Sequence, residues 1–121
     1  MPNEFSSIQI DLTPEYKKNL RDLAKRYRNI RSDTQEVIEQ IQTGNFIGDR
    51  IANLGENYFV LKVRVKNSNL QKGKRAGYRL IYQVESPTSI LLLTIYSKLD
   101  REDISANEIY GIIAEFNENE L

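Results

Sequence analysis

The stretch FVLKVRVK, residues 59–66, decides the fold, because from its third residue onward apolar and basic side chains alternate. Successive side chains of a β-strand point to opposite faces of the sheet. The apolar residues at odd positions therefore belong to a buried face, and Lys62, Arg64 and Lys66 belong to the opposite face. The pattern predicts a strand with one cationic side, in a sheet whose other side packs against helices.

Two more strands are predicted downstream, at residues 78–84 and 90–97. The turns between these segments are short, so neighbouring strands must run antiparallel. The last strand is apolar on both faces, which favours a central position in the sheet. Alternation assigns Tyr78 and Tyr82 to the core side and Arg79 to the cationic side, so neither Arg79 nor Lys62 is expected in the core.

Helices are predicted where apolar residues recur at helical spacing. Thr13 can cap the first helix, with Pro14 in the first helical position, where proline is tolerated. Ser32 and Gln35 have the spacing of a capping box, which predicts that a second helix opens there, and Gly44 is expected to end it. The short connection between these helices predicts a helical hairpin.

The remaining elements complete a single α+β domain over residues 1–121, with the order β-α-α-β-β-β-α. Alternation over residues 8–12 predicts the first strand, and residues 44–57 are expected to form a loop. Ser105 and Glu108 predict a second capping box, at the start of a C-terminal helix. The sheet is expected to be small and rich in antiparallel pairs, with the helical hairpin on one face.

The chain contains neither cysteine nor histidine, which excludes disulfides, thiolate nucleophiles, imidazole bases and the usual Cys/His metal sites. We therefore expect no metal and no small-molecule cofactor. No leader pattern opens the sequence, and no apolar run approaches the roughly 18 residues that span a bilayer. These features predict a cytoplasmic protein without a membrane contact.

The charges are balanced overall, 17 basic against 17 acidic residues, but they are segregated along the chain. Seven basic residues and no acid lie between Asn57 and Val84, whereas the chain from Leu99 onward carries seven acids and one basic residue. Same-face residues on a strand lie about 6.6–7 Å apart, close to the spacing of phosphates along a nucleic-acid strand. This match predicts that the basic face binds RNA. The cations assigned to RNA contact are Lys66, Lys72, Lys74, Arg75 and Arg101.

A metal-free set of lysine, arginine and tyrosine side chains can cleave RNA in principle. The reaction needs activation of the 2′-hydroxyl, stabilisation of the phosphorane and a proton for the leaving oxygen. Arginines clamp the phosphate, and a lysine crowded among arginines loses its proton more readily and can act as a base. The candidate catalytic residues are Lys62, Arg64, Arg79, Tyr96 and Lys98.

A plainer interpretation stands beside this one. A cationic outer face of a sheet is often only solvated, and lysine on an edge strand prevents edge-to-edge pairing. Tyr96 would then be a half-buried tyrosine without a role. Asp100, Glu102 and Asp103 are interpreted as solvated acids of a polar turn.

Three short motifs resemble those of the RelE/ParE superfamily of bacterial toxins, in particular its RelE and HigB branch. They are KVRVK at 62–66, GKRAGYRLIY at 73–82, and TIYSK at 94–98 followed by DRED at 100–103. The resemblance implies the toxin of a type II toxin–antitoxin pair. Such a toxin is an endoribonuclease that cuts mRNA in the ribosomal A site without metal, and a cognate antitoxin inhibits it by covering the basic face.

The resemblance also implies roles for individual residues. Lys62 and Arg64 match the catalytic basic pair, Arg79 matches the phosphate-stabilising arginine, and Lys98 falls near the late basic catalytic position. Some members carry a tyrosine shortly after that position, where this chain has Ser-Ala-Asn at 105–107, and Tyr96 is the candidate substitute. Two alternatives remain open: a ParE-like inhibitor of DNA gyrase that acts through its helical hairpin, and a catalytically silent domain that only binds a partner.

Overall fold

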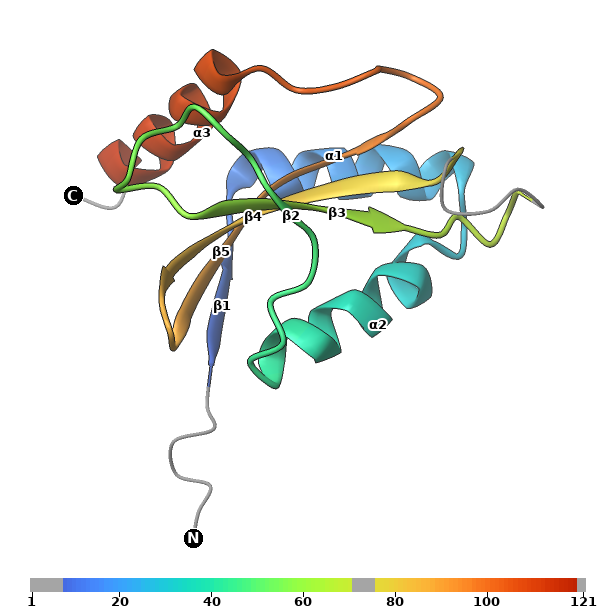
Figure 1. The fold of residues 1–121 in the computed structure, drawn as a ribbon. Coiled ribbons are helices and arrows are strands. Elements are labelled where there is room, and N and C mark those ends of the chain that lie inside the picture. The colour runs from blue at the N-terminus through green and yellow to red at the C-terminus, as the bar shows by residue number, and fades with distance from the viewer. Residues whose placement is uncertain (1–7, 71–75, 120–121) are drawn as a thin grey trace, which may run out of the picture.

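A five-stranded mixed sheet with the order β1-β5-β4-β3-β2 organises the computed structural model, which describes residues 8–70 and 76–119 (Figure 1). The strands are β1 (Gln9–Leu12), β2 (Asp49–Arg50), β3 (Val60–Val65), β4 (Tyr78–Ser86) and β5 (Ser89–Ser97). The helices are α1 (Pro14–Arg26), α2 (Ile30–Gln42) and α3 (Ala106–Asn119). β1 pairs with β5 in parallel, and the other neighbours are antiparallel. The predicted α+β class and the central position of β5 are confirmed.

β2 is an element that the predicted order lacks, since it lies in the segment expected to be a loop. Its two residues pair with Leu61 and Lys62 at the outer edge of β3. A strand of two residues is too short to display the alternation by which strands are recognised.

The first helix begins as predicted. The backbone N–H of Tyr16 donates to the Thr13 hydroxyl oxygen at 2.9 Å, with Pro14 in the first turn. The Thr13 hydroxyl in turn donates to the carbonyl of Leu93 at 2.6 Å. Thr13 therefore caps α1 and also fastens its start to β5.

The start of the second helix was predicted wrongly. α2 begins at Ile30 with Asn29 in the cap position, and the Ser32 hydroxyl donates to the Asn29 carbonyl at 2.9 Å. Ile30 is fully buried, and a helix that starts three residues earlier brings this side chain into the core. The helix ends before Gly44, which takes the positive φ of +89° expected of a terminating glycine.

The capping box predicted for α3 is only half formed. The N–H of Glu108 donates to the Ser105 hydroxyl oxygen at 3.1 Å, so Ser105 does cap the helix. The Glu108 carboxylate binds Arg101.

Two apolar clusters lie on opposite faces of the sheet. The cluster under α1 and α2 includes Leu80 and Tyr82, as the alternation in β4 predicted, and it confirms the helical hairpin on one face. The cluster under α3 includes Ile81, Leu91 and Leu93. Figure 1 shows α3 over one end of the sheet, with the segment before it passing across the other end.

Gly77 allows the close approach that brings β4 beside β3. A Cβ atom at this position would lie 2.0 Å from the carbonyl oxygen of Val65, far inside contact distance. No larger residue fits there without displacing the backbone of β3.

Candidate functional site

Three of the predicted catalytic residues form one row across the sheet. Arg64 of β3 is opposite Arg79 of β4, and Arg79 is opposite Tyr96 of β5. Directly opposed residues share a face, with Cβ atoms about 4.5–5.5 Å apart. The row lies on the α3 side of the sheet, where Tyr96 belongs to the apolar cluster.

Arg79 is buried, contrary to the expectation that it would lie outside the core. Only 5% of its surface is exposed; β4 is an interior strand, and Arg79 has a cross-strand neighbour on each side, Arg64 and Tyr96. One guanidinium nitrogen donates to the carbonyl of Tyr78 at 3.1 Å. Burial, and then repulsion from Arg64, lower the pKa of Arg79. The result is a fixed cation at the base of the row, next to the exposed Arg64.

Tyr96 is also buried and lies beneath the guanidinium of Arg101, whose central carbon is 5.1 Å from the ring centroid. Its hydroxyl is buried and has no hydrogen-bond partner among the described residues. Burial, followed by the negative charge of Asp103, raises the pKa of Tyr96. The phenol therefore keeps its proton at neutral pH.

Three other predicted cations around the row are paired with acids of residues 102–108. Lys62 lies 3.0 Å from Asp103, Lys98 lies 3.4 Å from Glu102, and Arg101 lies 2.6 Å from Glu108. The acids of this turn are exposed to solvent, as predicted, but they are also paired, since Asp100 likewise binds Arg26.

Asp103 is the central acid of this site, and sequence reasoning missed it. Its carboxylate accepts from the Ile104 N–H at 2.8 Å and binds Lys62, and these two interactions hold its pKa below the usual range. The four-residue spacing of Lys98 and Glu102 could have indicated their pair. Nothing in the sequence pairs Asp103 with a lysine 41 residues away.

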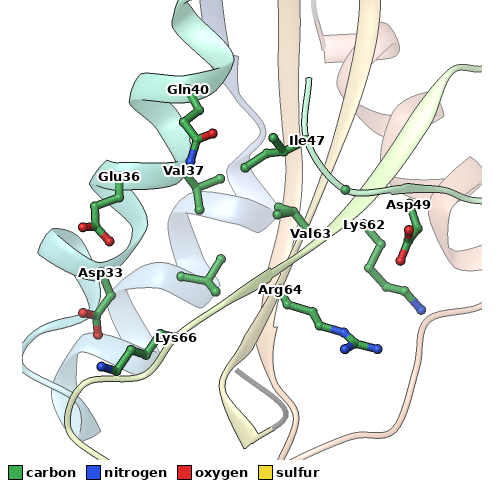
Figure 2. A pocket seen from close by; sticks show the side chains of 12 residues that line it. Asp33, Glu36, Val37, Gln40, Ile47, Asp49, Lys62, Val63, Arg64 and Lys66 are labelled. Atoms are coloured by element: carbon green, nitrogen blue, oxygen red, sulfur yellow. The ribbon is translucent and has the colours of Figure 1, made fainter. Parts of the chain in front are cut away.

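The predicted row of three β3 cations divides into two groups. Figure 2 shows Lys66 extending toward Asp33 of α2, whereas Lys62 and Arg64 extend away from that helix. β3 ends at Val65, so Lys66 lies beyond the regular alternation of the strand. Lys72, Lys74 and Arg75, also predicted to contact RNA, lie outside the described residues.

Residues 8–70 and 76–119 contain no group of three or more acidic, histidine or cysteine side chains arranged to hold a metal ion. Within the same ranges, no helix has the length and apolar character needed to cross a membrane.

Comparison with models of known protein families and with curated protein sequences found no match to this chain. The residues themselves therefore carry the functional assignment.

The row has the chemistry of an anion site with a proton donor beside it. Two adjacent guanidiniums can hold the non-bridging oxygens of one phosphate and stabilise added negative charge. The buried Arg79 cannot reorient freely, and this favours a preorganised site for the anion. Lys62 and Lys98 flank the row and can exchange protons, which arginine does not do.

Proposed function

We propose that this chain is a metal-independent endoribonuclease of the RelE/ParE superfamily, the toxin of a type II toxin–antitoxin pair, which cuts mRNA in the ribosomal A site. The observation that carries the proposal is the row Arg64, Arg79 and Tyr96 on one face of three neighbouring strands. The motifs KVRVK, GKRAGYRLIY and TIYSK, which resemble that family, supply these same strands.

In the proposed reaction, the RNA 2′-oxygen attacks the adjacent phosphorus and the bond to the 5′-oxygen breaks. The products are a 2′,3′-cyclic phosphate and a free 5′-hydroxyl. Arg64 and Arg79 hold the scissile phosphate and stabilise the phosphorane. The 2′-hydroxyl loses a proton and the 5′-oxygen gains one, and these transfers fall to Lys62, Lys98 and Tyr96.

The ion pairs at the site add a condition to this mechanism. Lys62 is engaged by Asp103, so a bound phosphate must compete with that carboxylate. The pairing also favours a second candidate function, a domain that binds its partner through this face without cleaving RNA.

Controlled expression in bacteria tests the proposal. The wild-type chain should stop incorporation of labelled methionine within minutes without producing gyrase-dependent DNA breaks. Arg64→Ala should restore translation, because it removes an exposed phosphate ligand without opening the core. Arg28→Ala, at an exposed arginine of the α1–α2 connection, is the matched control and should remain toxic.

DNA breaks with continuing translation would contradict the proposal and indicate a gyrase inhibitor. Unimpaired growth on expression of the wild-type chain would favour the silent binding domain.

A further inference from the structure

β1 leaves one edge of the sheet open. It stands at the end of the strand order and pairs with β5 on one side only. The N–H groups of Gln9 and Thr13 donate to carbonyls on the β5 side, at 2.8 and 3.1 Å. Backbone groups of alternate residues point to opposite edges of a strand, so Ile8, Ile10 and Leu12 direct theirs away from β5. Among the residues that the structure describes, none makes a hydrogen bond to these outward-facing groups.

The two edges of the sheet differ in how they are protected from pairing. Native proteins protect an open edge with charged side chains, especially lysine, or with proline. The β3 edge has β2 along part of it and carries Lys62 and Arg64. β1 contains neither lysine nor proline, and its one charged residue is Asp11. The outward-facing residues of β1 are apolar and partly exposed, so this edge is the one suited to pairing.

Two copies of β1 are complementary in one antiparallel register, in which Ile10 is opposite Ile10 of the second copy. Ile8 is then opposite Leu12, so the outward-facing residues form the hydrogen-bonded pairs. Gln9 is opposite Asp11, and these residues form the pairs whose side chains are closest. A side-chain amide therefore meets a carboxylate twice, once on each side of the symmetry axis.

Neighbouring registers lose this complementarity. A shift by one residue brings outward-facing groups opposite groups that are directed toward β5. A shift by two residues places Asp11 opposite Asp11 or Gln9 opposite Gln9, according to its direction. Directly opposed like charges are destabilising, and opposed glutamines leave the carboxylate without its amide. The sequence of β1 therefore favours one register.

We propose that the chain forms a two-fold symmetric dimer, in which the β1 strands of two copies pair antiparallel and join the two sheets into one. Main-chain hydrogen bonds of residues 8–12 provide the attachment. Within one chain, the Gln9 amide nitrogen lies 3.1 Å from the Asp11 carboxylate, so both side chains extend over the same face. In the dimer, this amide donates to Asp11 of the second copy, a charge-assisted hydrogen bond.

This dimer is closed and does not cover the proposed ribonuclease site. A two-fold interface uses the same patch of both copies, so assembly ends at two chains. β1 pairs with residues 89–92 of β5, and Tyr96 lies beyond that stretch. Directly opposed residues share a face, so the rows of both copies lie on the same face of the joined sheet. Dimer formation therefore does not rest on the proposed function.

Sedimentation velocity of the full chain measures the association. The paired segment is short, so we expect a dissociation constant of about 1–100 µM and a shift from monomer to dimer across that range of concentration. A chain that remains monomeric throughout, or that grows into larger assemblies, would overturn the inference.

Charge at position 9 tests the register. Gln9→Glu opposes two carboxylates on each side of the axis and should weaken the dimer about tenfold, whereas Gln9→Lys should strengthen it about threefold. The matched controls are Gln35→Glu and Gln35→Lys, at an exposed glutamine of α2, and they should leave the dissociation constant within about twofold. Circular dichroism checks that all four variants are folded. The same dissociation constant for both Gln9 variants would contradict the register.

Hydrogen exchange of single amides locates the interface. The N–H groups of Ile10 and Leu12 should exchange at least about tenfold more slowly when most of the chain is dimeric, because pairing protects them. The N–H of Asp11, which faces β5, should exchange at the same rate in the monomer and in the dimer. Dimer formation without slower exchange at Ile10 would place the interface elsewhere and overturn the inference.

Discussion

The two faces of the sheet differ in how completely they are devoted to stability. Under α1 and α2, the strands present an apolar surface from β3 to β5, including Val63, Leu80 and Leu92. On the opposite face α3 covers one end, and the other end holds Arg64, Arg79 and Tyr96. The comparison teaches that apolar packing on one face and on part of the other is sufficient to stabilise the fold. The rest of the second face can therefore carry charged side chains on rigid strands.

The largest expected effect is a difference in the free energy of unfolding between a substitution on one face of the sheet and a substitution on the other. Leu80→Ala removes a side chain that is 0% exposed, and should cost about 2–5 kcal/mol in the free energy of unfolding. Arg64→Ala, on the exposed end of the other face, should change it by less than about 0.5 kcal/mol. Urea unfolding followed by circular dichroism measures both, and similar losses would contradict the division of labour between the faces.

Arg79 tests the distinction between residues that stabilise the fold and residues that are proposed to bind RNA, because it is both buried and charged. Arg79→Met keeps an apolar stem of similar length and removes the charge, so the free energy of unfolding should change by less than about 1.5 kcal/mol. RNA cleavage should fall about a hundredfold or more. A variant that unfolds, or one that still cleaves at the wild-type rate, would show that Arg79 has been assigned the wrong role.

Asp103→Asn should release Lys62, the lysine beside the row, from its ion pair and so make it available to RNA. An exposed ion pair is worth about 0.2–1 kcal/mol, so releasing Lys62 should raise affinity for RNA by up to about fivefold. Fluorescence anisotropy with an RNA blocked by a 2′-deoxy substitution measures binding without cleavage. Asp11→Asn, at an acid of β1, is the control and should leave the affinity unchanged. A lower affinity in the Asp103 variant would mean that this acid helps to bind the nucleotide.

The smallest effect concerns the pair of Arg101 and Glu108. Arg101 holds the pKa of Glu108 below its usual value of 4.5, so ionised Glu108 stabilises the folded state above that pH. This contribution is lost as the pH falls through the folded-state pKa. Between pH 6 and pH 3, Glu108→Gln should therefore lose less stability than the wild type, by under about 1 kcal/mol because the pair is partly exposed. Urea unfolding at both pH values, with Glu115→Gln as control, checks the sign, and a larger loss in the Glu108 variant would contradict it.

Local patterns were sufficient to predict most of the fold. Alternation in β3 and β4 placed Leu61, Tyr78 and Tyr82 in the core, and the cap at Thr13 fixed the start of α1. The start of α2 was missed because burial of Ile30 outweighed the local capping pattern at Ser32. β2 was missed because two residues are too few to show the alternation of apolar and polar side chains that identifies a strand.

The candidate site was predictable only in part, for a related reason. Residues on regular strands could be assigned to a face, which brought Arg64, Arg79 and Tyr96 together. The depth of Arg79 depends on both neighbouring strands, and the position of Asp103 depends on the path of an irregular segment. Tertiary structure determines both, and no pattern in the sequence reports them.

The most direct test of the central claim is to map cleavage of an mRNA programmed into ribosomes, with the purified chain and no divalent cation beyond what the ribosome requires. The wild type should cut within the A-site codon and leave a 2′,3′-cyclic phosphate, and Arg64→Ala should cut at least a hundredfold more slowly while unfolding at the same urea concentration. An intact mRNA after incubation with the wild type, or equal cutting by the variant, would contradict the claim that these strands form one site for a phosphodiester.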